Sequence, residues 1–352
     1  MLLEKSEPPG KKSLRQNEET NYKIPLPLLI PYTAENKIFY ENGLAKFIQR
    51  LKLKVHSKTD ECFLLWEKFS KKESLFDLWD FRYSWFQGYQ YTPCFYTIYE
   101  GKNPLALLPL WFDKEDGRYE WFGSEWMEDN YFFTKDTKFI SLLLKLIPQK
   151  LFLNAIDQIP GDLSSEVISK QDDDKYIKII KNFKNVEDCL KTIPKKYRYN
   201  LKKDYLRICD YNPRIEFVTQ ISDDLNEFEE FKKLSIGRFS SKNGSDLVNN
   251  ERVEAFKAFI KNRGVYQIKF IKVYIQNRLA ASDLILMYNK TYYTPRSSCD
   301  IDRFSGIGNF MFYLEFEDAI KNGFEKIDCL QVDYGYKHRY FEGVKKYIIE
   351  KE

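Results

Sequence analysis

Alternation of apolar and polar residues predicts a group of short strands early in the chain. The segment LKLKV (51–55) alternates with period two. Residues 93–112 contain two apolar runs around the polar turn 100–103, and a third run follows the turn 114–117. Runs of this length bounded by turn residues are typical of β-strands. The pattern therefore predicts an antiparallel group of strands in the first half.

Segments with the apolar periodicity of a helix lie between these strands and after them. Ser74 opens an amphipathic stretch with apolar residues at helical spacing, and Gly88 is expected to end that helix. A second helix is expected over about 136–148, followed by a strand at 151–156. The first half thus predicts a mixture of strands and helices.

The second half repeats this order. Asp223 or Asp224 is expected to cap a helix that runs through Leu234, and a second helix begins near 250–251 and ends near 263–264. Three strands then follow within 265–298. The hairpin at 99–112 resembles the hairpin at 274–287, with Leu-Ala pairs 174 residues apart. A long-period duplication is one interpretation, and two unrelated β-meanders are the other.

Turn-forming and polar residues suggest where the chain divides into domains. Residues 1–35 are expected to form a mobile tail, 36–162 a first domain and 163–352 a second. The boundary rests on Pro160-Gly161-Asp162 and the polar run 163–175. The apolar run 25–32 is short and contains three prolines, so no membrane span is predicted and a cytoplasmic location is expected.

Charge and cysteine content narrow the function classes. The 352 residues carry 56 basic and 52 acidic side chains, which argues against a DNA-binding protein with a basic domain. The chain has two histidines and six dispersed cysteines without a CxxC pair, so no metal site is predicted. Aromatic residues make up 17% of the chain and suit a large core or a ligand groove equally well.

The most specific local motif is Arg303-Phe304-Ser305-Gly306-Ile307-Gly308, between a predicted strand and a predicted helix. Glycines at such a junction allow close backbone approach and direct several N–H groups at an anion, and the helix dipole adds to the attraction. The alternative is an ordinary glycine-rich loop that caps a buried helix. The residues assigned to this phosphate cradle are Arg303, Ser305, Gly306, Ile307, Gly308 and Asn309.

A second candidate site lies near the C-terminal end of the sequence. A predicted apolar strand is followed by Asp333, Tyr336, Lys337 and His338. A carboxylate, a phenol, an amine and an imidazole within six residues are the groups that proton transfer requires. A charged surface turn is the alternative.

Two further groups are candidates for binding substrate. The segment 195–207 carries six basic residues and one acid, with Tyr197, Leu201 and Tyr205 on one apolar helical face. Its basic side is suited to an anion, or is simply the solvated side of an amphipathic helix. The residues singled out as substrate contacts are Tyr292, Arg296, Asp300 and Arg198, although aromatic core packing also explains the tyrosine.

The order of these motifs resembles the GNAT superfamily of acyltransferases. The nearer resemblance is to the two-domain CelD/BcsL-type acetyltransferases of cellulose and exopolysaccharide biosynthesis, which are related to the Fem-type peptidyltransferases. It covers roughly 51–345 and rests on an ordered set of segments: LFDLWDFRYSWF, ALLPLWF, RYEWFGS, IPKKYRYNLKK, NRLAASDLIL, Asp300 before RFSGIG, and Tyr336-Lys337.

The resemblance implies two tandem GNAT-like α/β (α+β) domains, each a mixed, mostly antiparallel sheet flanked by helices. It implies acetyl-CoA or another acyl-CoA as cosubstrate, with its pyrophosphate at the Arg303–Asn309 cradle, and no metal. An amine or hydroxyl of a sugar or cell-envelope precursor then attacks the thioester carbonyl directly. Asp333 or His338 serves as base, and Tyr336 or Lys337 orients or protonates the leaving group. The first half lacks R-x-x-G-x-G, so one coenzyme site is implied.

Two other functions remain open from the sequence. One is a Fem-type peptidyltransferase, which uses aminoacyl-tRNA and would bind it through the 195–207 helix. The other is a non-catalytic binding module in an envelope-polymer complex.

Overall fold

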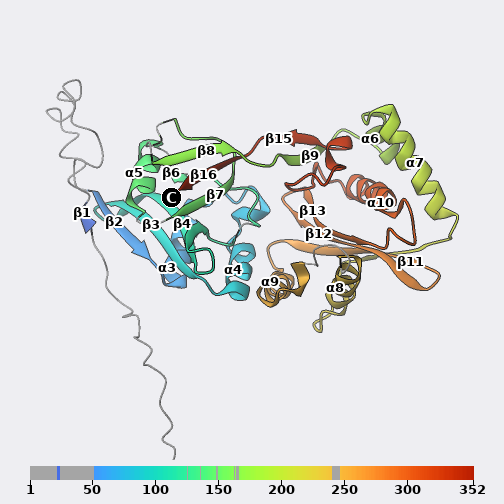
Figure 1. Ribbon diagram of the computed structural model, residues 1–352, viewed down its shortest axis with the longest axis horizontal. Helices are drawn as coiled ribbons and strands as arrows, with labels where there is room; N and C mark the ends of the chain where they lie inside the picture. Colours follow the sequence, from blue (N-terminus) through green and yellow to red (C-terminus); the bar gives the residue numbers. More distant parts are fainter. Residues whose placement is uncertain are drawn as a thin grey trace, which may run out of the picture.

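The computed structural model describes Tyr22–Lys23 and residues 51–352, apart from positions 125, 135, 148–149, 162, 164–165 and 240–245. The expected tail, 1–35, and the start of the first expected domain lie outside the described residues, except for Tyr22–Lys23, which form strand β1. Described strands and helices build two sheets with helices packed on them (Figure 1).

Among the described residues, the first sheet has nine strands in the order β1-β2-β3-β4-β5-β7-β16-β8, with β6 beside β4. The strands predicted at 51–55, within 93–112, after 114–117 and at 151–156 are confirmed. Their bounds and those of the other strands are β2 Leu51–His56, β3 Thr92–Glu100, β4 Asn103–Asp113, β5 Arg118–Trp121, β6 Phe133–Thr134, β7 Leu151–Ile156, β8 Val167–Gln171 and β16 Tyr347–Lys351.

Helices of the first half are α3 Thr59–Phe69, the short 3-10 helix η3 Leu75–Asp77, α4 Trp79–Tyr89 and α5 Lys138–Leu146. The helix expected to stop at Gly88 instead runs through it, and Gln90 ends it in the left-handed conformation. Gly88 faces another helix: a Cβ there would lie 2.6 Å from the backbone nitrogen of Ala255. This glycine therefore serves close helix packing rather than helix termination.

The second sheet has seven strands in the order β10-β11-β12-β13-β14-β9-β15. Its strands are β9 Lys175–Ile179, β10 Arg214–Val218, β11 Gln267–Ile275, β12 Arg278–Tyr288, β13 Thr291–Cys299, β14 Lys326–Asp328 and β15 Glu342–Val344. Its helices are α6 Val186–Lys191, α7 Lys195–Cys209, α8 Asn226–Phe239, η4 Asp246–Val248, α9 Asn250–Lys261, α10 Ile307–Lys321 and η5 Lys337–Arg339. In Figure 1, α6, α7 and α10 cover one face of this sheet, and α8 and α9 cover the other.

The same succession of elements occurs in both halves. An antiparallel hairpin, a third strand, a helix and a parallel fourth strand appear as β3-β4-β5-α5-β7 and again as β11-β12-β13-α10-β14. The parallel pairs are β5 with β7 and β13 with β14. The similarity of the two hairpins in sequence thus extends to the order of the elements around them.

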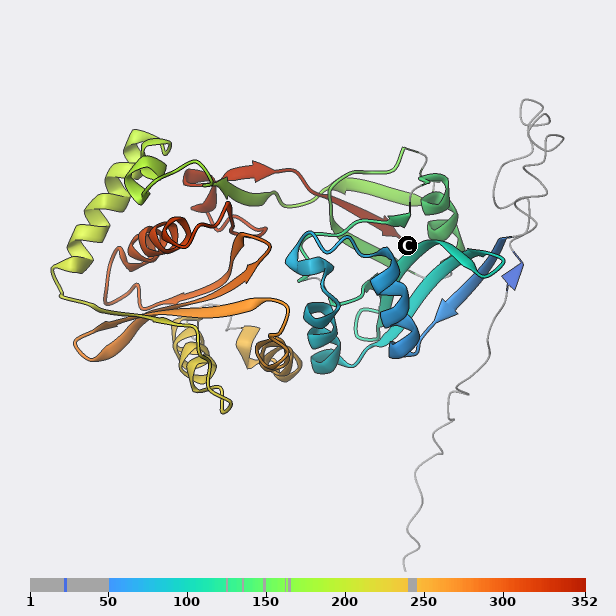
Figure 2. The ribbon, with the colours of Figure 1, turned by 180° about the vertical axis from the view of Figure 1, so that it is seen from behind.

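A long β-ribbon joins the two sheets. The chain leaves β8 in the first sheet and enters β9 in the second, while β15 in the second sheet leads to β16 in the first. Because β8 pairs with β16 and β9 with β15, both crossings run side by side (Figure 2). The polar run 163–175, expected to separate two domains, therefore includes strand β8. The division at residue 162 remains a prediction, and the sheets interleave across it.

The two halves also share one apolar core. A single cluster of buried residues includes Trp66, Trp85 and Phe122 from the first half and Phe256 and Phe270 from the second. Ring contacts cross between the halves, such as Trp85 with Phe256 at a centroid distance of 5.7 Å. Burial of large aromatic surfaces on both sides stabilises the two halves as one unit.

Candidate functional site

The parallel pairing of β13 with β14 is confined to the start of β13. Thr291 to Tyr293 pair with Lys326 to Asp328, whereas β13 continues to Cys299 along β12. After β14 the chain turns, with Leu330 and Val332 at positive φ. Ser297, in the continuing part of β13, is exposed. The two strands thus diverge just before the chain enters α10, and polar residues of β13 become accessible there.

The predicted strand–loop–helix context of the R-x-x-G-x-G motif is confirmed. The loop follows β13, and Gly306 is the N-cap of α10 with φ of +93°, a conformation that favours glycine. Open space surrounds a Cβ built at Gly308. Arg303 is 61% exposed and lies 3.7 Å from Asp300 through its Nε. Ser305 is exposed, Asn309 half-buried, and Ile307 buried in the core.

A carboxylate from the basic helix α7 lies against this loop. A Cβ at Gly306 would lie 2.7 Å from Cγ and 2.8 Å from Oδ1 of Asp204. Asn309 donates its side-chain N–H to Asp204 Oδ2 at 2.6 Å, and Tyr340 donates its hydroxyl to Asn309 Oδ1 at 2.8 Å. Arg207 Nη1 lies 3.3 Å from Asp204 Oδ1. The Asp204 carboxylate therefore lies beside Gly306, where the sequence predicted that an anionic ligand would bind.

This arrangement tests whether a coenzyme A pyrophosphate fits. The open side of Gly308 and the start of α10 suit an anion. The carboxylate beside Gly306 does not, because it already supplies negative charge to the helix terminus and repels a second anion at short range. With Asp204 in this position the cradle does not fit a pyrophosphate.

Two of the four residues predicted to transfer protons, Asp333 and His338, are hydrogen-bonded to each other. Asp333 Oδ2 is hydrogen-bonded to Nδ1 of His338, and its Oδ1 accepts backbone N–H groups of Gly335, Tyr336 and Lys337 at 2.7–2.9 Å. Partial burial raises the pKa of Asp333, but these bonds outweigh it and lower the pKa to about 2. Asp333 is thus a weak base that orients His338, whose ring is half-exposed.

The other two predicted residues, Tyr336 and Lys337, make contacts outside the Asp333–His338 pair. Lys337 is buried and donates to the carbonyl oxygen of Gln331. Tyr336 packs against Phe312 of α10, with ring centroids 5.5 Å apart, and burial raises the pKa of its phenol. Tyr336 therefore stays protonated, as a proton donor must, whereas Lys337 serves the backbone of its own turn.

The predicted substrate contacts are dispersed. Tyr292 is fully buried, and its hydroxyl donates to Asp318 Oδ2 at 2.8 Å, so it belongs to the core. Arg296 is half-buried, with its guanidinium 6.0 Å from the ring of Trp126. Asp300 accepts the backbone N–H of Arg303 at 3.3 Å, and Arg198 donates to the carbonyl of Lys191 at 3.1 Å. The structure does not gather these four residues into one pocket.

Sequence reasoning missed a buried pair of carboxyl groups, Asp283 on β12 and Glu315 on α10. Both side chains are buried and each shifts the pKa of the other, and Asp283 is opposite Ser297 in the register of β12 and β13. Burial raises the pKa of Asp283 to about 6 and, together with the charge of Asp283, holds the pKa of Glu315 well above its usual value. The signal available in the sequence was a charged residue, Asp283, inside the mostly apolar strand LAASDLILM.

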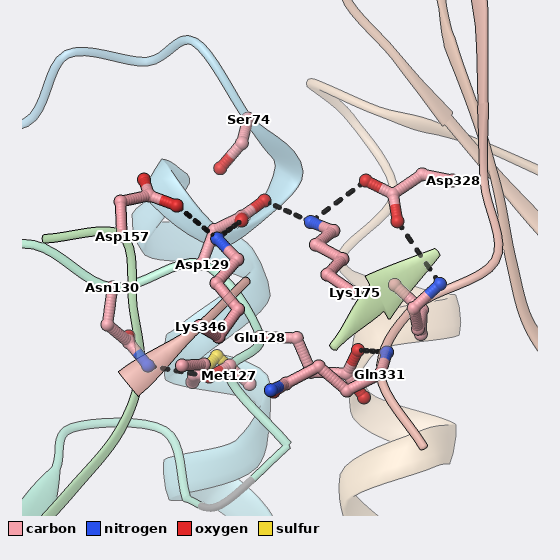
Figure 3. A network of polar contacts seen from close by, with 12 residues as sticks. Ser74, Met127, Glu128, Asp129, Asn130, Asp157, Lys175, Asp328, Gln331 and Lys346 are labelled. Atoms are coloured by element: carbon pink, nitrogen blue, oxygen red, sulfur yellow. Dashed lines mark hydrogen bonds and ion pairs between the residues drawn. The ribbon is translucent and has the colours of Figure 1, made fainter. Parts of the chain in front are cut away.

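A charged network where the β-ribbon crosses between the sheets was also missed (Figure 3). Lys175 lies 2.5 Å from Asp129 and 2.8 Å from Asp328, and Lys346 lies 2.7 Å from Asp129 and 2.5 Å from Asp157. Burial raises the pKa of Asp129, but the two lysines outweigh it and lower the pKa to about 2. The network therefore links the first half to both strands of the ribbon.

Glu128, next in sequence, accepts the backbone N–H of Gln331 (Figure 3). Burial raises the pKa of Glu128 to about 7, although this bond opposes the shift. The loop of the first half is thereby fastened to the turn that carries Tyr336 and Lys337.

An apolar cavity lies between the halves. Aromatic residues from η3, α4 and α9 line it together with residues of β13, among them Phe76, Trp85, Phe256, Tyr293 and Pro295. The cavity reaches β13 where this strand leaves β14.

Among the described residues, Asp113, Asp116 and Glu120 are close enough together to hold a cation. Arg118 lies 2.9 Å from Asp116 and 2.7 Å from Glu120, so an internal cation already pairs with two of the three. No helix in the described part of the chain is both long and apolar enough to cross a membrane.

Comparison with known proteins identifies the class of the second half. Residues 195–338 match the family model described as an acetyltransferase (GNAT) domain. These residues include α7, the loop before α10 and the turn with Asp333 and His338. No curated protein matches the sequence. Residues 195–338 are thus similar to a GNAT-type acetyltransferase domain.

Solved structures extend the fold to the whole described chain. The C-terminal domain of a putative lysylphosphatidylglycerol synthetase from Agrobacterium fabrum matches with a TM-score of 0.53 at 9% identity, covering 84% of this chain and 92% of that one. L-PGS from Bacillus licheniformis gives 0.52 at 12%, covering 84% and 92%. A tandem GNAT protein from the clavulanic acid biosynthesis pathway gives 0.50 at 7%, covering 86% and 98%. The tandem GNAT-like fold is therefore confirmed, whereas the nearer resemblance to the CelD/BcsL type stays a prediction.

Proposed function

We propose that this protein is an acyltransferase that moves an acyl group directly from an activated carrier to an amine or hydroxyl of a sugar or cell-envelope precursor in the cytoplasm. The observation that carries the proposal is the Asp333–His338 pair, which follows β14 in the chain within the segment that matches a GNAT-type domain. Holding donor and acceptor in one geometry supplies most of such catalysis.

His338 is the proposed general base and Asp333 its positioning residue. Asp333 holds Nδ1 of His338, which leaves Nε2 for the acceptor proton. Tyr336, kept protonated by burial, is the proposed donor of a proton to the leaving group. Lys337 takes no part in this scheme, because its ammonium group is engaged by the Gln331 carbonyl.

The resemblance to a GNAT-type domain suggests acetyl-CoA or another acyl-CoA as donor, whereas Asp204 beside Gly306 opposes its pyrophosphate at the start of α10. Aminoacyl-tRNA is the second candidate. It is favoured by Asp204 beside Gly306, which opposes a pyrophosphate, and by the exposed basic residues Lys195, Lys196 and Lys203 on α7.

Separate tests of turnover and binding examine this proposal. We expect His338→Gln to lower turnover by about 10²–10⁴-fold with donor affinity retained, and to remove the limb of the pH–rate profile that reports the base. Tyr334→Phe, at a 78% exposed side chain, is the matched control. Wild-type turnover with acetyl-CoA, or with charged tRNA, identifies the donor; activity with neither, in the presence of amine and sugar acceptors, contradicts the proposal and favours a non-catalytic binding module.

A further inference from the structure

We propose that Asp204 is a specificity-determining residue that excludes a diphosphate from the N-terminus of α10. This inference rests on the proposed function. It deepens that function because it restricts the chemistry of the acyl donor. A carrier whose diphosphate must be held at this helix terminus is rejected by the wild-type chain.

Asp204 first blocks the loop sterically. Gly306 has no side chain, and the space where a Cβ would lie is filled by Asp204 atoms at 2.7–2.8 Å. This face of Gly306 therefore lies against α7, the helix that carries Asp204. A ligand oxygen that approached the Gly306 backbone from this side would meet the Asp204 carboxylate.

The second step is electrostatic. The N-terminus of a helix carries a partial positive charge of about half an elementary charge. One full negative charge on Asp204 more than compensates it, so the helix no longer offers a diphosphate a net attraction on this side. Arg207 offsets part of that negative charge but is itself turned to Ser305, with its Nη1 3.3 Å from the carbonyl and the hydroxyl oxygens.

The third step is that Asp204 is held in place. Asn309, the third residue of α10, donates to Asp204, and Tyr340 fixes the orientation of the Asn309 amide. The Asp204 side chain is 17% exposed, and Tyr205, next in α7, stacks on Phe310 with ring centroids 5.3 Å apart. Moving the carboxylate away therefore requires breaking contacts between two packed helices.

Calorimetric titration with coenzyme A and with inorganic pyrophosphate tests the inference without using activity. Asp204→Asn keeps the shape and removes the charge; Asp204→Ala also clears the space. We expect weak or undetectable binding by wild type, a gain in affinity in Asp204→Asn, and a larger gain of at least tenfold, about 1.4 kcal/mol, in Asp204→Ala. Asp210→Asn, an exposed carboxylate at the end of the same helix, is the matched control and is expected to bind like wild type.

A second substitution locates the gained site. Adding Gly308→Val to Asp204→Asn is expected to abolish the gain, because the new side chain occupies the open face at the start of α10. Two results overturn the inference: tight coenzyme A binding by wild type that Asp204→Asn does not strengthen, and no gain in a folded Asp204→Asn or Asp204→Ala protein. A gain without turnover in any variant would leave the inference standing and contradict the proposed acyl transfer.

Discussion

Two glycines at the start of α10 have different physical surroundings although they stand two residues apart. Gly306 adopts a positive φ and is in contact with Asp204, whereas Gly308 is helical and has open space where a side chain would lie. In the sequence both look like glycines that admit a ligand. In the structure Gly306 admits a carboxylate of the same chain, and Gly308 is the one that faces open space.

A pair of alanine substitutions separates these surroundings. We expect Gly306→Ala to lower the free energy of unfolding by about 1–3 kcal/mol, because the new Cβ strains the backbone and overlaps Asp204. Gly308→Ala is expected to leave it unchanged or raise it by about 0.4–1 kcal/mol. Urea denaturation measures both, and equal losses would contradict this account.

The carboxyl pair on β12 and α10 makes stability depend on pH. The pKa of Asp283 is raised by burial from 3.8 to about 6, so the folded state binds this proton more tightly than the unfolded state. The corresponding stability is fully present below about pH 4 and is lost as the pH rises to about 6. We expect Asp283→Asn to flatten the decline between these values, as measured by urea midpoints.

The control for this titration is Asp302→Asn, at an exposed carboxylate of the loop before α10. It is expected to keep the wild-type decline. A decline in Asp283→Asn as steep as in wild type would mean that the pair does not hold the proton in the folded state.

At the scale of elements, close contact between α4 and α9 joins the two halves. Gly88 lies against the backbone of α9, where a Cβ would be 2.6 Å from the nitrogen and 2.7 Å from the Cβ of Ala255. Asn262, just after α9, donates to Ser84 and Gln87 of α4 at 2.8 Å. These helices therefore pack backbone to backbone at one point, and polar contacts extend the interface.

Gly88→Ala is expected to destabilise the protein by about 1–3 kcal/mol, because neither helix backbone can yield without opening the shared core. Gly237→Ala in α8 is the matched control, since open space surrounds its added Cβ. That variant is expected to be neutral or slightly more stable. A wild-type melting temperature in Gly88→Ala would show that the helices separate easily.

Which elements could be predicted depends on how local their signal is. Short segments of sequence contain both the alternation of apolar and polar residues and the turn residues that bound a strand. This local pattern predicts β3, β4, β11, β12 and β13. Strands β8 and β16 were not predicted, since β8 is mostly polar and both are ordered by pairing with each other. The loop before α10 was likewise predicted from local sequence. The position of Asp204 was not, because it depends on how α7 packs against α10, about 100 residues further along the chain.

At the scale of the whole molecule, the charged network at the ribbon crossing holds the sheets together. Asp129 of the first half is the acceptor shared by Lys175 and Lys346 on the two ribbon strands (Figure 3). Its removal leaves two buried ammonium groups, each with one remaining carboxylate, Asp328 or Asp157. Breaking such a buried network is far more costly than losing an exposed ion pair.

We therefore expect Asp129→Asn to lower the free energy of unfolding by about 3 kcal/mol. Asp173→Asn, at an exposed side chain of the same ribbon, is expected to change it by less than about 0.5 kcal/mol. Chemical denaturation followed by tryptophan fluorescence compares the two. Similar small effects from both would show that solvent compensates the lost charge.

The exchange of strands along the ribbon has a consequence for synthesis. Chains generally fold from the N-terminal side while the ribosome is still extending them. Here β7 and β8, made early, must wait for β16, which lies between them and is translated after the whole second sheet. Until β16 arrives, β7 keeps an unpaired edge and β8 lacks its partner strand among the described strands, and unpaired edges are a known template for association with other chains. The nascent protein is thus exposed to misassembly for longest in the half that is translated first.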